Sequence, residues 1–167
     1  MRAYHRVTAG KKETLSLSNA AHFLLEECRM VLPGIQALFG FQLVAVFSQA
    51  FSEKLTATEQ QLHLAAIALV AIAIALIMTP AAYHRQAAPD EITDAFIRLS
   101  TRMLLWSMWP LMLGICAEFY LVARVLAGPT AAPLLSAGLL LLFLLLWFVL
   151  PRTRFLQEIT MENPESR

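Results

Sequence analysis

Glu118 is the residue most able to take part in chemistry, because it is the one acid of a long apolar run that extends from 103 to 126. A carboxylate inside a bilayer is costly unless it is paired, protonated or hydrated. Gln42 and Gln49, seven residues apart in an earlier apolar run, and His63, at the start of the next run, are expected at a similar depth. We therefore predict a polar site inside the membrane, made of Glu118, Gln42, Gln49 and His63.

Two interpretations of Glu118 are open. In the functional interpretation, its carboxyl group binds a proton or a monovalent cation during transport. In the structural interpretation, a protonated or hydrogen-bonded glutamate ties its helix to the glutamines of the first apolar run. We prefer the structural interpretation, because a transport pathway ordinarily contains more than one intramembrane charge. A structural role would survive the substitution Glu118→Gln.

The histidines and cysteines do not indicate a haem or a metal site. Ligation of haem by two histidines needs both at a similar depth on facing helices. His63 and His84 lie at opposite ends of one apolar run, and His22 precedes the first run. No group of Cys, His and Asp has the spacing of metal ligands. We expect no metal, no cofactor, and free thiols at Cys28 and Cys116.

Enzyme motifs are also missing from the sequence. It has no nucleophile elbow, phosphate-binding loop, zinc motif or pair of glycosidase-type carboxylates. The basic residues of the first 12 positions are scattered as in an ordinary cytoplasmic flank, and we expect no nucleic-acid partner. The chain is therefore predicted to have no catalytic residues and not to be an enzyme.

Composition indicates a membrane protein. Of the 167 residues, 58% are hydrophobic and 15% are charged, whereas about a quarter of the residues in soluble domains are charged. Between Arg29 and Glu53 lie 23 residues without a formal charge. At about 1.5 Å per residue they can cross a hydrocarbon layer of roughly 30 Å. Three later runs have the same character, so the predicted fold is all-α, an integral membrane four-helix bundle in contact with the lipid bilayer.

The predicted organisation is a transmembrane domain, 16–154, between two tails. Residues 1–15 are predicted to form a mobile basic cytoplasmic tail, and 155–167 a polar cytoplasmic tail. The first and third helices extend beyond the bilayer at the cytoplasmic interface. The first should begin between Ser16 and Asn19, which are helix-capping residue types, and the third near Pro89. The predicted spans cover about 30–52, 62–83, 103–126 and 134–150.

Small residues recur in the second span. Ala68, Ala71, Ala75 and Thr79 have a spacing that lets a neighbouring helix come close in a membrane, where hydrophobic burial gives helices no advantage over lipid. This span is therefore predicted to lie centrally among the helices.

The basic residues are distributed unevenly about the predicted spans. The tails and the second loop with its flanks hold 11 of the 13 Lys and Arg residues, whereas Lys54 and Arg124 lie on the other side. Because cytoplasmic flanks carry the excess of basic residues, both termini are predicted to be cytoplasmic. Trp106, Trp109 and Trp147 fall on the same boundary, as expected of aromatic anchors.

Two motifs carry a resemblance to a known family. The entry to the first span reads ECRMVLPGIQ (27–36), and the exit of the second reads TPAAYHR (79–85). Over roughly residues 20 to 150, the chain resembles a family of small four-helix bacterial membrane proteins catalogued as a domain of unknown function. Its members are sometimes labelled automatically as sodium/proton antiporters, although large antiporters have many more helices and paired intramembrane acids.

The resemblance implies a location in the bacterial inner membrane and supplies no catalytic residues. It singles out Gln36, His84 and Arg85 in the cytoplasmic half. Together with Glu27 and Arg29 they form a candidate cytoplasmic-side motif, in which His84 and Arg85 would contact a lipid headgroup or an acidic side chain.

Two functional classes follow from these observations. In the first, the chain is a non-catalytic accessory or structural subunit that packs in a larger membrane assembly or a homo-oligomer through its alanine-rich second span. In the second, it is a small proton or monovalent-cation transporter or channel that uses Glu118. The first is preferred because few charges lie within the spans and four helices of one chain leave little room for a polar pore.

Overall fold

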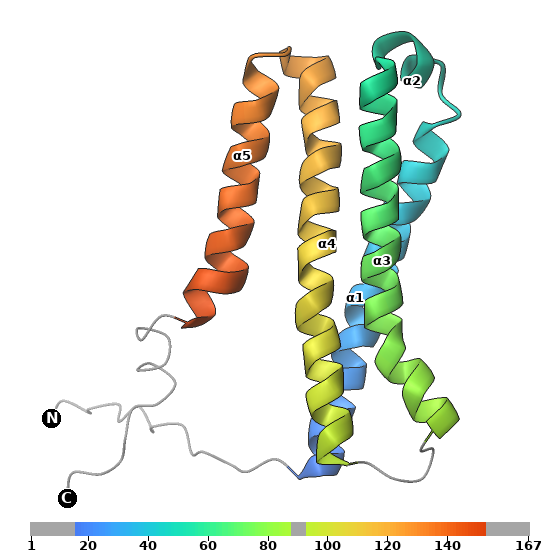
Figure 1. Ribbon diagram of the computed structural model, residues 1–167, viewed down its shortest axis with the longest axis vertical. Helices are drawn as coiled ribbons and strands as arrows, with labels where there is room; N and C mark the ends of the chain where they lie inside the picture. The colour runs from blue at the N-terminus through green and yellow to red at the C-terminus, as the bar shows by residue number, and fades with distance from the viewer. Residues whose placement is uncertain (1–15, 88–92, 153–167) are drawn as a thin grey trace, which may run out of the picture. The chain divides into compact units, whose positions relative to one another are not determined.

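The computed structural model describes residues 16–87 and 93–152, and within these ranges the chain is helical and contains no strand (Figure 1). Its helices include four that are long and apolar enough to span a bilayer: Asn19–Ala45, Ala57–Gln86, Asp94–Ala127 and Ala131–Arg152. The predicted all-helical class is confirmed, and the four long apolar helices support the membrane location predicted from composition. The two predicted tails and Pro89 lie outside the described residues.

Helix α1, Leu17–Ala45, begins where the sequence predicted. Ser16 is its N-cap, and the Ser16 hydroxyl accepts a hydrogen bond from the backbone N–H of Asn19 at 3.3 Å. The helix ends at Ala45, whereas the predicted first span continued to 52. Short i to i−3 bonds tighten its last turn, and the Ser48 hydroxyl donates to the Ala45 carbonyl at 2.8 Å. These local bonds satisfy carbonyl groups that would otherwise continue the helix.

Helix α2, Gln49–Lys54, was not predicted, because its residues were assigned to the first span and a loop. Ser48 precedes it in an extended conformation, which turns the chain before α2 starts. α2 leads into α3, Ala57–Ala87, which passes through Pro80 and changes direction toward its C-terminal end (Figure 1).

Helix α4, Asp94–Ala127, follows a Thr93 N-cap whose hydroxyl accepts from the backbone N–H of Phe96 at 3.2 Å. Gly128, with φ of 88°, ends α4 in a conformation that favours glycine. After it come α5, Ala131–Leu144, a π-helical turn, Leu145–Val149, and a 3₁₀ turn, Leu150–Arg152.

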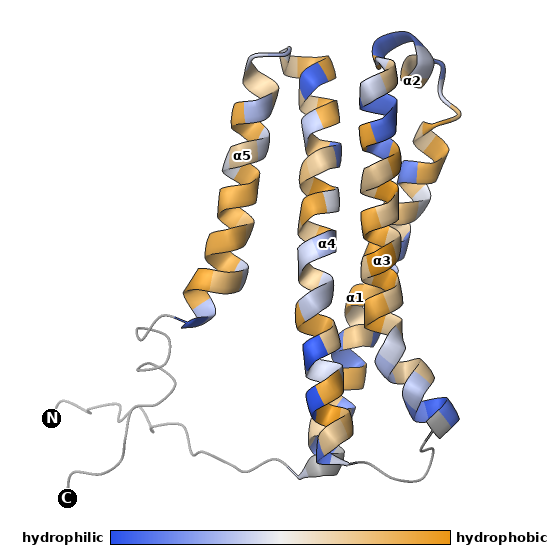
Figure 2. Ribbon diagram, viewed as in Figure 1, coloured by the Kyte–Doolittle hydropathy of each residue, from blue (hydrophilic) through white to orange (hydrophobic). Residues whose placement is uncertain are grey.

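Most of these helices belong to one compact unit, Leu15–Leu140, in which α3 is the central helix and contacts both α1 and α4. Figure 2 shows apolar residues through the middle of α3 and hydrophilic ones toward its ends, the pattern expected of a membrane helix. The described residues from Leu141 to Arg152 belong to a second unit, in which the rings of Phe143 and Trp147 pack with centroids 4.6 Å apart.

Helices α3 and α4 approach each other closely at Gly114 of α4. A Cβ atom added there would lie 3.0 Å from Cγ2 of Val70 and 3.2 Å from the carbonyl oxygen of Ala66. The face of α3 that meets α4 is fully buried, with Ala66, Val70 and Ala73 each at 0% exposure. The absence of a side chain at Gly114 therefore lets α4 pack closely against α3.

Candidate functional site

Three helices bring Gln42, His63 and Glu118 together at one end of the first unit. Gln42 lies in the last turn of α1, His63 in the second turn of α3, and Glu118 in the C-terminal third of α4. Helices α1 and α4 run in the opposite direction to α3 (Figure 1), which is why positions near the end of α1 and α4 can meet one near the start of α3.

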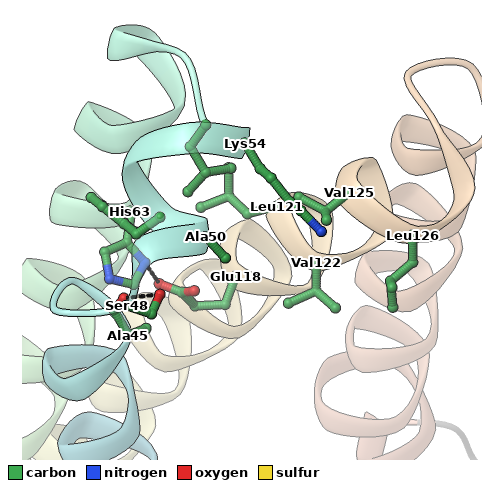
Figure 3. Close-up of a pocket in the computed structure, with 12 residues that line it drawn as sticks. Ala45, Ser48, Ala50, Lys54, His63, Glu118, Leu121, Val122, Val125 and Leu126 are labelled. Carbon is green, nitrogen blue, oxygen red and sulfur yellow. Dashed lines mark hydrogen bonds and ion pairs between the residues drawn. The ribbon is translucent and has the colours of Figure 1, made fainter.

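Hydrogen bonds join the three residues into one cluster. Nδ1 of His63 lies 2.8 Å from Oε1 of Glu118, and Nε2 of Gln42 donates to the same oxygen at 3.2 Å. The other nitrogen of His63, Nε2, lies 3.0 Å from the backbone carbonyl oxygen of Gln42. Figure 3 shows the bond between His63 and Glu118. Glu118 thus ties α4 to both α3 and α1.

This geometry fixes the number of protons that the cluster holds. A carbonyl oxygen only accepts hydrogen bonds, so Nε2 of His63 carries a hydrogen and donates it to Gln42. The contact between Nδ1 and Oε1 of Glu118 therefore needs one more proton, on either atom. The pair is a neutral histidine with a carboxylic acid or an imidazolium with a carboxylate, and in both forms its net charge is zero.

Two of the three cluster residues are buried, whereas the side chain of Glu118 remains 18% exposed. Gln42 is 4% and His63 3% exposed, and the ring of Phe51 covers His63 edge-on with centroids 5.0 Å apart. Oε1 of Gln42 is buried and has no hydrogen-bond partner among the described residues. A buried amide oxygen of this kind costs free energy, so the bonds made by the rest of the cluster must hold Gln42 in place.

A cavity of about 270 Å³ lies beside the cluster, between α2 and α4. Figure 3 shows Glu118 and His63 beside α2, and Lys54 reaching across from α2 toward Val125. Most other lining residues are apolar: Ala45, Ala50, Phe51, Leu55, Leu121, Val122, Val125 and Leu126, with Ser48 at the turn.

A second polar contact lies nearer to the end of the helices. Oε2 of Glu59 accepts from the backbone N–H and the hydroxyl of Thr56, at 2.8 Å and 2.9 Å, which caps the start of α3. Oε1 of Glu59 pairs with Nε of Arg124, near the end of α4, at 2.6 Å. Glu59 is not among the site residues predicted from the sequence, although Thr56 followed by Glu three residues later is the pattern of a capping box.

Gln49 lies apart from the other three residues of the predicted polar site. Because α1 ends at Ala45, Gln49 begins the separate helix α2 and is exposed. The seven-residue spacing would place Gln42 and Gln49 on one face only if a single helix continued through both residues.

The candidate cytoplasmic-side motif is not gathered into one cluster. Glu27, Arg29 and Gln36 are exposed along α1, and Arg85 is exposed near the end of α3. Among the described residues, no ion pair joins His84 or Arg85 to an acid. The His84 ring packs instead against Phe96, with ring centroids 5.5 Å apart, and the buried Nδ1 of His84 has no partner in the described part of the chain.

The arrangement of Gln42, His63 and Glu118 can hold a proton and join three helices. Within the described ranges, no group of three or more His, Cys, Asp and Glu side chains is placed to hold a metal ion. The cavity next to Glu118 supplies the space in which that carboxyl group could meet a further molecule.

Comparison with known proteins gives a family and no assigned activity. No curated protein and no solved structure matches the chain. A family model described as a family of unknown function (DUF6328) matches residues 12–151, which confirms the resemblance seen in the sequence. The chain belongs to this family of unknown function, DUF6328.

Proposed function

We propose that this protein is a non-catalytic accessory or structural subunit of the bacterial inner membrane, which assembles with other membrane subunits or with copies of itself. The observation that carries the proposal is the free face of α3. Ala68, Ala71, Ala75 and Thr79 are all exposed along this face.

The two faces of α3 are of different kinds. At about 100° per residue, the exposed small residues lie opposite the buried face made by Ala66, Val70 and Ala73. The buried face already contacts α4 within the chain. A helix of another subunit could approach the exposed face closely, because small side chains let two backbones come near each other in lipid.

The proposed orientation has both termini in the cytoplasm. It rests on the excess of Lys and Arg beside the tails and the second loop. In this orientation the Glu59–Arg124 pair, Lys54 and the cavity face the outer boundary of the membrane.

Cross-linking in native membranes tests the proposed assembly. Cys28 and Cys116 are replaced by Ala, and a single cysteine is introduced by Ala71→Cys or Ala75→Cys and modified with a photoactivatable benzophenone. We expect irradiation to yield discrete protein adducts, either with a second copy of the chain or with a different polypeptide.

Leu113→Cys is the matched control, because Leu113 is 43% exposed in the middle of α4 and lies outside the free face of α3. We expect lipid adducts at this control position. Lipid adducts alone at Ala71, Ala75 and Leu113 would contradict the proposal.

The second candidate is a small proton or monovalent-cation transporter that uses Glu118, and it is favoured by the 2.8 Å contact between Nδ1 of His63 and Oε1 of Glu118, two groups that can bind a proton. Against it stand the apolar residues that fill the interface beyond the cluster, Val70, Ala73 and Met112. Further along α4, the hydroxyls of Ser107 and Ser100 donate to carbonyls of their own helix. Cation-coupled proton flux in proteoliposomes that is lost in Glu118→Gln would favour transport over the accessory role.

A further inference from the structure

We propose that the cavity beside Glu118 binds a neutral lipophilic molecule that carries a hydroxyl group, an alcohol or a phenol, taken up from the bilayer. The proposal concerns a ligand of this chain and stands whether or not the chain assembles with other subunits.

The shape and lining of the cavity suit an apolar body. Its volume of about 270 Å³ is close to the lower end of known small-molecule sites. The wall that α4 contributes is aliphatic, and two of its residues, Val122 at 53% and Leu126 at 81%, are also exposed on the surface of the helix. A molecule dissolved in the lipid can therefore reach the cavity without crossing water.

The cluster has an acceptor left for a ligand, so the ligand must be a hydrogen-bond donor. Both nitrogens of His63 are already engaged, with Glu118 and with the carbonyl of Gln42. Both contacts that described residues make with Glu118 go to Oε1. Oε2 of Glu118 therefore remains for a ligand. It only accepts hydrogen bonds, whether the shared proton resides on Oε1 or on Nδ1 of His63.

The charges around the cavity favour a ligand with a hydroxyl group over one with an ammonium group. The His63–Glu118 pair is neutral in either form, and Lys54 is the remaining formal charge among the residues that line the cavity. Its side chain extends toward Val125 across the cavity (Figure 3). A cationic donor would be repelled by this lysine without a net negative charge to offset it, whereas an alcohol or phenol donates without carrying charge.

Photolabelling of the full chain in nanodiscs tests the proposal. The probe is an eight-carbon alkanol that carries a diazirine, and the labelled peptides are identified by mass spectrometry. We expect labels on α2 and on the 121–126 segment of α4. Excess 1-octanol or 4-butylphenol should reduce them, and octane or octylamine at equal concentration should not.

Variants separate specific binding from partition into lipid. Val122→Trp fills the cavity and should lower the labelling about tenfold, which corresponds to about 1.4 kcal/mol. Leu113→Trp, on α4 but outside the cavity, should leave labelling unchanged. If Val122→Trp does not fold, Ala50→Trp fills the cavity from α2. Glu118→Leu should abolish the preference for octanol over octane, because the acceptor is gone.

Two results would overturn the proposal. One is equal competition by octane and octanol in the unmutated protein, and the other is unchanged labelling when the cavity is filled. A competition series with a diacylglycerol distinguishes the source of the hydroxyl. Displacement by diacylglycerol supports a membrane lipid as the ligand, and displacement by octanol and butylphenol alone supports a smaller molecule.

Discussion

Oε1 of Glu118 is hydrogen-bonded to two side chains, and these bonds join three helices. Its partners, Gln42 and His63, come from α1 and α3. The proton that it shares with His63 removes the net charge that would otherwise make a carboxylate so costly in a bilayer. A single intramembrane acid is thereby accommodated without a second acid.

Substitutions of Glu118 should differ sharply in their cost. In Glu118→Gln, the new amide group can donate to Nδ1 of His63 and to Oε1 of Gln42 once the Gln42 amide turns over, so every bond is replaced. We expect a loss of less than about 1 kcal/mol in unfolding free energy in mixed micelles. Glu118→Leu strands the polar groups of His63 and Gln42, and we expect a loss of roughly 2–4 kcal/mol.

Glu53→Leu serves as the control for this series, since Glu53 is an exposed carboxylate on α2. It should change the unfolding free energy by no more than about 0.5 kcal/mol. Equal destabilisation by Glu118→Gln and Glu118→Leu would show that the carboxylate charge itself is needed, which would contradict the view that the hydrogen bonds of Glu118 hold the helices together.

At the scale of single residues, depth along a helix was the useful signal in the sequence. It predicted that Glu118, Gln42 and His63 would lie at one height. It failed for Gln49, because the end of α1 is set by bonds at Ser48 that involve no charge and no proline. Residue types alone could not reveal that local break.

At the scale of elements, α3 is the helix on which the packing depends. Its residues 64–78 are all apolar, so its sequence carries no periodic signal that separates the face toward α4 from the face toward lipid. Gly114 of α4 determines which face of α3 packs against α4, since Ala66 and Val70 of α3 lie against this glycine. This is why the length of the helix was predictable and its packing face was not.

Enlarging Gly114 should separate α3 from α4. Even a single Cβ atom added at Gly114 would lie 3.2 Å from the carbonyl oxygen of Ala66, and Gly114→Leu adds three more carbon atoms. A backbone oxygen cannot move aside easily. We expect a loss of about 1–3 kcal/mol in unfolding free energy, measured by denaturation in mixed micelles.

Two further variants make this packing test specific. Gly40→Leu on α1 should be almost neutral, because a Cβ there meets nothing within 4 Å. Trimming the facing side chain in the pair Gly114→Ala with Val70→Ala should recover stability relative to Gly114→Ala alone. No recovery in that pair would mean that Val70 does not limit the approach of the two helices.

At the scale of the whole molecule, the polar cluster and the exposed small-residue face of α3 occupy different parts of the Leu15–Leu140 unit. The buried polar cluster lies at one end, next to the cavity, whereas the small residues of α3 face outward along its length. The membrane class followed directly from composition, because four long apolar helices leave few alternatives. The function could not be predicted from composition, since a helix surface that binds another helix and a helix surface that faces lipid use similar residues.

The mass of the particle purified from native membranes in a mild detergent tests the proposed assembly most directly. Native mass spectrometry reads the mass and identifies co-purifying polypeptides in one experiment. We expect a complex of fixed stoichiometry, either several copies of this chain or this chain with another membrane subunit. The double substitution Ala71→Leu with Ala75→Leu should dissociate it. A particle with the mass of one chain of 18.6 kDa, at every detergent concentration that keeps the protein folded, would contradict it.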